Sequence, residues 1–241
     1  FEFMARPYGI VPRDIVEEAA WPALRGQIFG EACEIFLRLL NGEIVNSKII
    51  RKTVLTRSNF RSDEDWSNVQ NAIIERDSLD QKPDSITIPN RYIFEDVKNI
   101  PQAWNRNLLD LILGSHDPIL QKEINKIRPV KVFNLSITPP EVIEATHARM
   151  SEYYHKDGGS WKRNYMPRTL MVFVNDEPDL SEAERTEAAK EEAEKSLSSY
   201  WGALEGTIDP MKVSKAADNS VIGNVEEVAR QIVDRFHPDD C

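Results

Sequence analysis

The chain has 241 residues, 41% of them hydrophobic, so it is long enough to bury a sizeable core in one large or two small domains. Its 40 acidic side chains outnumber its 30 basic ones, and the resulting formal charge of −10 argues against a general nucleic-acid surface. Two cysteines, Cys33 and Cys241, are too few for a disulfide scaffold, and no apolar run approaches a membrane span. We therefore expect a cytoplasmic protein with neither a nucleic-acid nor a membrane partner.

The N-terminal part of the chain is expected to be a loop followed by helix. Residues 1–12 are punctuated by proline and glycine and predict a loop. Apolar residues recur at three- and four-residue steps from Gln27 to Leu40, which predicts a helix that ends at Asn41-Gly42. Residues 14–25 predict a further helix, with a break near Pro22.

The next stretch has a weaker pattern. Residues 44–60 mix β-favouring side chains with arginine and lysine, which is typical of a surface hairpin or an edge strand. A short helix is expected over 63–75. We expect the whole segment 59–105 to be an insertion or a long loop. Such segments form lids or binding loops, or are disordered, and the sequence leaves these alternatives open.

The chain is organised around an apolar run at 108–113 that ends abruptly in Gly-Ser-His-Asp-Pro. The run predicts a strand buried on both faces, as in a parallel sheet. Gly114 lets a ligand approach the backbone, Ser115 offers a hydroxyl and an N–H, and a helix that follows would point its N–H groups at an anion. Alternatively, these residues form a tight turn in which Asp117 caps the helix and Pro118 is its first residue.

Two further strand–helix units are expected after this turn. A strand over 129–137 would complete a right-handed, parallel βαβ unit. Thr138 and Glu141 have the spacing of a capping box at the start of the next helix. A third strand, 167–175, precedes an acidic helix from 182 to about 200, whose shallow apolar side places it on the outside.

The last predicted element is a helix with a clear start and a clear stripe. Asn224 can cap it with Glu227 three residues later, and His237-Pro238 ends it. Its apolar residues follow a helical period and are Val225, Val228, Ala229, Ile232, Val233 and Phe236. We expect the chain to end before this helix can be followed by another strand.

Six stretches of the chain occur in an order that suggests a family. They are 1–10 with Glu-Phe and Gly-Ile, 29–43, 111–115, 131–140 with Pro-Glu, 168–175, and 222–229 with Ile-Gly and Glu-Glu-Val-Ala. Together they resemble the bacterial-luciferase-like flavin-dependent oxidoreductases. The segment 59–105 has no counterpart in that resemblance.

The resemblance implies a fold. The expected architecture is α/β, a (β/α)₈ TIM barrel of the luciferase-like type. This chain would hold its fifth to seventh strands with their helices, and the first half and the last strand would be absent. Residues 1–241 would then form a single, partial domain. A partial barrel leaves open edges, so we expect a dimer or a partner chain.

The resemblance also implies a function. A flavin-dependent monooxygenase would use reduced FMN and O₂ on a small organic substrate, with a flavin reductase as the source of reduced cofactor and the deazaflavin F420 as the less favoured cofactor. The family places the flavin phosphate at the end of the sixth strand, which maps onto Gly114 and Ser115, with His116 nearby. No catalytic residue is identified. The alternative is a non-catalytic partial barrel that serves as a partner subunit or binds flavin without turnover.

One competing pattern is a possible metal motif. Glu144 and His147 have the spacing of half a di-iron site, but the sequence has no second Glu-x-x-His pair, so we expect no metal and interpret them as an exposed helix pair. His155 and His237 lie near predicted helix ends, where they can interact with the helix dipole.

Overall fold

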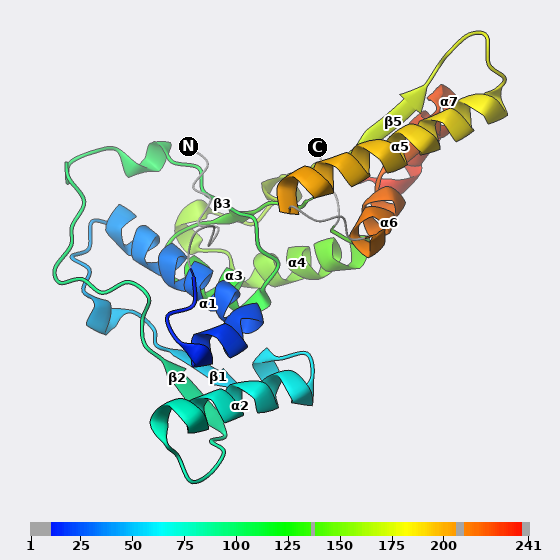
Figure 1. Ribbon diagram of the computed structural model, residues 1–241. Coiled ribbons are helices and arrows are strands. Elements are labelled where there is room, and N and C mark those ends of the chain that lie inside the picture. Colours follow the sequence, from blue (N-terminus) through cyan, green and yellow to red (C-terminus); the bar gives the residue numbers. More distant parts are fainter. Residues whose placement is uncertain (1–10, 136–137, 206–209, 238–241) are drawn as a thin grey trace. The chain divides into compact units, whose positions relative to one another are not determined.

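Figure 1 presents the computed structural model of the chain, which describes residues 11–135, 138–205 and 210–237. The chain divides into two compact units, residues 1–109 and 110–241, and each is described by itself. Within the described ranges, no helix has the length and apolar character that crossing a membrane requires.

The first unit is built on a long helix, α1 (Ile15–Leu40), which begins at the side-chain cap of Asp14. The expected break at Pro22 is wrong, because α1 runs through this proline without interruption. Ala20 and Leu24 on either side of Pro22 are buried in the same core. The burial of residues on both sides of Pro22 in one core keeps the chain helical past a residue that lacks one hydrogen bond.

Two strands and a second helix complete this unit. Strand β1 (Thr53–Thr56) pairs antiparallel with β2 (Ser85–Ile88), and α2 (Asp63–Asp77) lies between them in the sequence. The helix predicted over 63–75 is therefore confirmed, with Ser62 as its cap. Segment 59–105 carries both α2 and β2.

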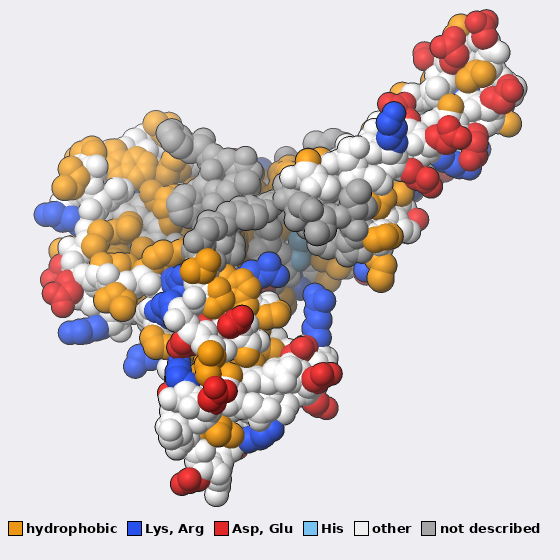
Figure 2. Space-filling view, in the orientation of Figure 1, with side chains coloured by type: hydrophobic (Ala, Val, Ile, Leu, Met, Phe, Trp, Pro, Cys, Tyr) orange, Lys and Arg blue, Asp and Glu red, His pale blue; other side chains and the backbone are white. Residues whose placement is uncertain are grey.

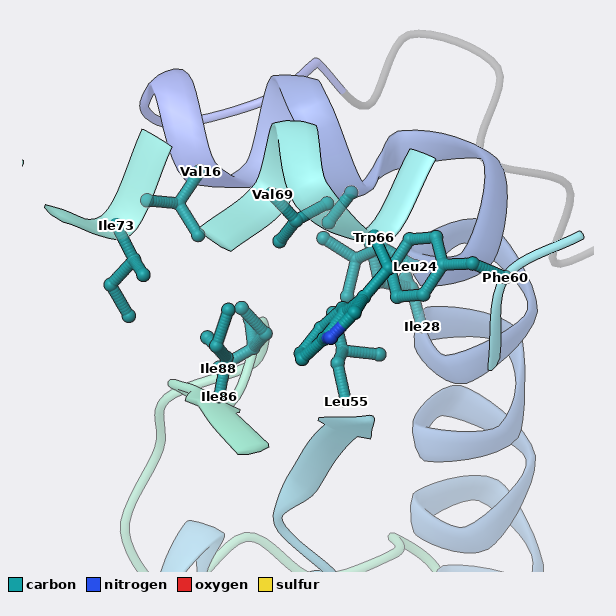
Figure 3. Close-up of a cluster of buried hydrophobic side chains, with 11 residues drawn as sticks. Val16, Leu24, Ile28, Leu55, Phe60, Trp66, Val69, Ile73, Ile86 and Ile88 are labelled. Carbon is teal, nitrogen blue, oxygen red and sulfur yellow. The ribbon is translucent and has the colours of Figure 1, made fainter. Parts of the chain in front are cut away.

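One hydrophobic core joins these four elements. Leu55 of β1 and Ile86 of β2 pack with residues of α1 and with Trp66 of α2 (Figure 3). Alternate residues of the strands point the other way, so Val54 is half exposed. β1 thus has one core face, and in its two-stranded sheet it is an edge strand, which is one of the two predicted alternatives.

The second unit alternates short strands and helices. Its elements in chain order are β3 (Ile112–Leu113), α3 (Pro118–Asn125), β4 (Lys131–Val132), α4 (Pro140–Tyr153), β5 (Val172–Asn175), α5 (Glu182–Glu205), α6 (Pro210–Asn219), β6 (Val221–Asn224) and α7 (Val225–Arg235). β3 pairs with β4 and β5 pairs with β6, both in parallel. An isolated parallel bridge joins Asn134 to Arg168.

The predicted (β/α)₈ TIM barrel, complete or partial, is wrong. Within the described residues the strands form three separate two-stranded sheets, and the rest of the fold is mainly helical. The strands are also much shorter than the apolar runs that predicted them. A barrel needs strands that are paired continuously around the whole sheet, whereas in the described part of this chain a single bridge between Asn134 and Arg168 links the β3–β4 pair to the β5–β6 pair.

The organising strand illustrates this difference. Of the run at 108–113 only Ile112 and Leu113 are strand, and residues 106–108 form a 3₁₀ turn. Leu113 is 5% exposed but Ile112 is 46% exposed and Leu108 81% exposed. The strand is therefore buried on one face, and the prediction of two buried faces was wrong.

The C-terminal part contains a strand that the sequence analysis missed. No strand was predicted over β6, but it pairs with β5 from Val172↔Val221 to Asn175↔Asn224. Helix α7 follows at once and has the predicted capping box of Asn224 and Glu227. Its apolar stripe is only partly buried, because Val228 lies in the interior while Val233 is 79% exposed.

Helix α5 is the acidic helix that the sequence predicted. Figure 2 shows acidic side chains gathered over this part of the molecule, and the exposed ones include Glu184, Glu187 and Glu191. Ala189, Ala193 and Leu197 on its opposite side are buried. The predicted solvated face with a narrow apolar side is therefore confirmed.

Candidate functional site

The turn after β3 carries the three residues predicted to bind a cofactor. Gly114 is exposed, and a Cβ placed on it would meet no atom within 4 Å. The hydroxyl oxygen of Ser115 accepts a hydrogen bond from the backbone N–H of Asp117 at 3.3 Å, which leaves the hydroxyl proton for a ligand. Ligands of α/β sheets bind outside the carboxyl ends of parallel strands, and this turn lies at such an end.

Asp117 occupies the N-terminus of α3. Its Oδ1 accepts hydrogen bonds from the backbone N–H groups of Ile119 and Leu120, at 2.8 and 3.2 Å, and Pro118 is the first helical residue. The alternative in which Asp117 caps the helix is thus confirmed. An anion cannot use these N–H groups without displacing a carboxylate of like charge. Any anion at this turn would depend on side-chain donors.

His116 connects the turn after β3 to the segment after β4. Its Nε2 lies 3.2 Å from Oγ1 of Thr138, while its Nδ1 is buried and has no hydrogen-bond partner among the described residues. Burial, followed by the positive charge of Arg149, lowers the pKa of His116 from its ordinary value of 6.5. The imidazole is therefore neutral at neutral pH, with Nδ1 available to donate or accept according to the tautomer.

Thr138 does not have the role that its sequence spacing predicted. The N-cap of α4 is Pro139, and no side chain caps this helix. The Thr138 side chain is buried, and its hydroxyl bonds to His116 instead. The predicted capping box with Glu141 is therefore wrong.

The buried side chain of Gln121 forms hydrogen bonds with both the turn and α4. This side chain is completely buried. Its Nε2 donates to the backbone carbonyl of Ser115 at 2.8 Å, and its Oε1 accepts from Nη1 of Arg149 at 2.6 Å. One amide thus holds both the backbone of the turn and a guanidinium group.

The lowered pKa of His116 predicts that the second unit loses stability in acid. Folding disfavours the charged imidazole, so the unfolded chain binds more protons as the pH falls below 6.5. Hydrogen exchange of the α3 amides should show full protection above pH 6.5 and progressively less below it, down through the folded-state pKa. The variant His116→Gln should lack this part of the pH dependence. An unchanged pH profile in that variant would contradict the assignment to His116.

Glu144 and His147 do not form a metal site. Glu144 pairs with Arg163 at 2.6 Å, and Nδ1 of His147 accepts a hydrogen bond from the indole of Trp161 at 2.9 Å. Among the described residues, no group of three or more histidine, cysteine or acidic side chains could hold a metal ion.

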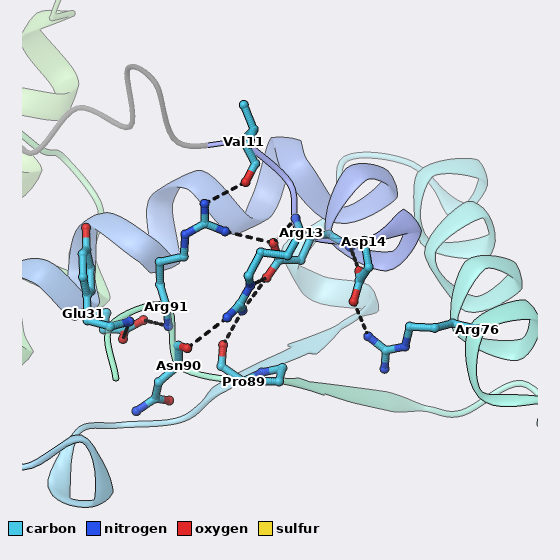
Figure 4. Close-up of polar contacts among 10 residues, drawn as sticks. Val11, Arg13, Asp14, Glu31, Arg76, Pro89, Asn90 and Arg91 are labelled. Carbon is cyan, nitrogen blue, oxygen red and sulfur yellow. Dashed lines mark hydrogen bonds and ion pairs between the residues drawn. The ribbon is translucent and has the colours of Figure 1, made fainter. Parts of the chain in front are cut away.

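The first unit contains a second polar cluster, built around Glu17. The buried carboxylate of Glu17 bonds to Arg13 and Arg91, and Glu31 accepts the backbone N–H groups of Arg91 and Tyr92 at 3.1 and 3.0 Å (Figure 4). The arginines also donate to backbone carbonyls of the segments that flank the cluster. These charges satisfy one another, so we interpret the cluster as structural.

Sequence reasoning missed two members of the candidate site, Gln121 and Arg149, and assigned the wrong role to a third, Thr138. Gln121 and Arg149 carried a weak signal, because each is a polar residue on the apolar side of a predicted helix. Thr138 was noticed, but its spacing to Glu141 favoured a local role. These residues come together only because α3 packs against α4, and the local sequence pattern does not predict that packing.

No family model matches the chain, and no curated protein matches it either. Among solved structures, the chain is similar to the crystal structure of monooxygenase RslO1 from Streptomyces bottropensis, with 16% sequence identity and a TM-score of 0.42. The match covers 74% of this chain and 50% of that one, so this chain spans about half the length of that structure.

Proposed function

We propose that this chain is a flavin-dependent monooxygenase, or a part of one, that holds the phosphate of FMN at the turn after β3. The observation that carries the proposal is the hydrogen bond between His116 and Thr138, which brings together polar residues that follow two adjacent parallel strands. The order of the luciferase-like sequence stretches supports the choice of flavin.

The donors at this turn suit a phosphate group. Ser115 can donate its hydroxyl proton, His116 has an unused ring nitrogen, and the guanidinium of Arg149 lies close enough to lower the pKa of His116. The exposed Gly114 leaves room beside the backbone. When bound, reduced FMN would supply the activation of O₂, while these residues bind and orient the cofactor.

A flavin titration tests this proposal directly. Purified protein is added to FMN and the quenching of flavin fluorescence is followed. We expect Ser115→Ala to weaken FMN binding by up to about tenfold, the value of one hydrogen bond. Gly114→Val should weaken it because its methyl groups enter the space that the ligand uses.

The controls separate binding from folding. Ser199→Ala removes an exposed hydroxyl of α5 and should bind FMN like the parent chain. Gly114→Val should not unfold the turn, since a Cβ at this position meets nothing within 4 Å. FMN binding that neither Ser115→Ala nor Gly114→Val affects would place the flavin elsewhere. The absence of FMN binding would refute the proposal.

The second candidate function is that of a non-catalytic partner subunit. It is favoured by the open face of β5, where Val172 and Val174 are 44% and 47% exposed while Phe173 between them packs towards α5 and α6. Parallel strands are usually covered on both faces. A chain that binds no flavin but is stable only together with another protein would favour this alternative.

A further inference from the structure

We propose that the second unit binds a phosphate monoester through the guanidinium of Arg149, next to Ser115 and His116. The inference rests on the proposed function, since the phosphate of FMN is the ligand that this group would hold. It adds a residue of α4 to a site that the sequence placed in the turn after β3 alone.

The positive charge of Arg149 has no carboxylate partner among the described residues. Its side chain is partly buried, and its hydrogen bond within the described residues goes to the neutral amide of Gln121. Other partly buried arginines, such as Arg38, Arg91 and Arg163, each pair with a carboxylate. A guanidinium has five N–H donors in a planar fork that matches oxyanions. Arg149 therefore keeps donors, and an uncompensated positive charge, for an anionic ligand.

The guanidinium group of Arg149 is held in place by a buried side chain. Gln121 is 0% exposed, and its amide is fixed because the Ser115 carbonyl needs a donor while Arg149 needs an acceptor. The same helix is anchored to the start of β4 by Asn125, which exchanges two hydrogen bonds with Val130 at 3.1 Å. The turn, α3 and α4 are thus joined by buried amides. The Arg149 side chain therefore loses little further conformational freedom when it binds an anion.

The N-terminus of α3 is not open to an anion. Asp117 already takes the first free N–H groups of α3. A phosphate near this turn must therefore obtain its positive charge from a side chain, and Arg149 is the cation whose field reaches His116. A site of this kind differs from one that uses a helix N-terminus, because it should depend on one guanidinium group.

Isothermal titration calorimetry with three probes tests the inference: inorganic phosphate, FMN, and riboflavin, which lacks the phosphate. In Arg149→Met we expect phosphate and FMN to bind at least about tenfold more weakly, since a charge-assisted bidentate contact is lost. Riboflavin should bind equally to both proteins. Arg230→Met, which removes an exposed arginine of α7, is the matched control and should behave like the parent chain.

The outcomes separate this inference from the proposed function. FMN binding that is undiminished in Arg149→Met overturns the inference and leaves the proposed function intact. Phosphate binding that depends on Arg149, without any FMN binding, supports the anion site and overturns the flavin proposal. Failure of both phosphate and FMN to bind the parent chain overturns both.

A second variant covers the case in which Arg149→Met does not fold, as judged by circular dichroism. Arg149→Lys keeps the charge but loses the planar fork. We expect it to bind phosphate more weakly than the parent chain and to lose more of that binding when salt is added. Equal affinity and equal salt dependence in the two proteins would overturn the inference.

Discussion

Glu17→Gln should lower the free energy of unfolding of the first unit by about 3 kcal/mol, as expected when one member of a buried charge cluster is neutralised. The Glu17 side chain is 3% exposed and lies between Arg13 and Arg91, whose side chains are 36% and 16% exposed. Removal of the carboxylate leaves two guanidinium groups facing each other. The segment at 89–92 should then keep its backbone hydrogen bonds to Glu31 but lose the ion pair that links Arg91 to Glu17 of α1.

The matched control for this prediction is Glu18→Gln. Glu18 is the next residue of the same first helical turn, so both variants lose a similar interaction with the helix dipole. Glu18 is exposed, and its substitution should change stability by less than about 0.5 kcal/mol. Native-state hydrogen exchange of the α1 amides measures both variants in the unit concerned. Equal effects of the two substitutions would show that the cluster contributes nothing beyond the dipole.

A double-substitution cycle identifies the origin of the effect. Arg91→Gln alone should destabilise the unit, because Glu17 then keeps only the more exposed Arg13 as an ionic partner. In a chain that already carries Glu17→Gln, the change Arg91→Gln should lower the free energy of unfolding by much less, because it removes the repulsion between the two guanidinium groups. Additive losses would contradict direct coupling between Glu17 and Arg91.

The helices that the sequence predicted well are those with local start signals. Ser62 caps α2, Asp117 caps α3, and Asn224 with Glu227 forms the capping box of α7. These contacts join residues two or three positions apart, so their spacing is visible in the sequence. Pro22 and Thr138 gave equally local signals that failed, because core packing in one case and His116 in the other made the stronger interaction.

The strands were predicted poorly because strand pairing is not local. β2 finds its partner some thirty residues earlier in the chain, and β6 pairs with β5 across two helices. An apolar run predicts that a segment is buried, but it does not say whether two residues or six will pair. The runs predicted strands and the resemblance implied the barrel, and the short strands at Ile112 and Lys131 show the limit of both inferences.

The candidate site likewise has one part that local sequence predicts and one part that depends on tertiary packing. Gly114, Ser115 and His116 are adjacent in the sequence, so a motif could identify them. Gln121 and Arg149 reach them only because α3 packs against α4. The turn could therefore be predicted from the sequence, whereas the two side chains are placed beside it by the packing of the helices.

Gln121→Met should lower the free energy of unfolding of the second unit by about 3 kcal/mol, because two hydrogen bonds of a completely buried amide are lost. Methionine has a similar volume, so little of this loss comes from a cavity. The Ser115 carbonyl then has no donor, and Arg149 loses its neutral anchor. FMN affinity should fall as well, since both groups are released from their fixed positions.

Gln231→Met is the matched control for Gln121→Met. Gln231 has the same kinds of partner, a backbone carbonyl of Ile222 at 2.7 Å and the guanidinium of Arg235 at 3.3 Å, but it is only partly buried. Water can replace these bonds, so the control should lose about 1 kcal/mol or less and keep its FMN affinity. Hydrogen exchange of α3 and α7 reports each loss separately. If Gln121→Met is no more harmful than Gln231→Met, the buried amide does not hold the turn, and the positioning of Arg149 needs another explanation.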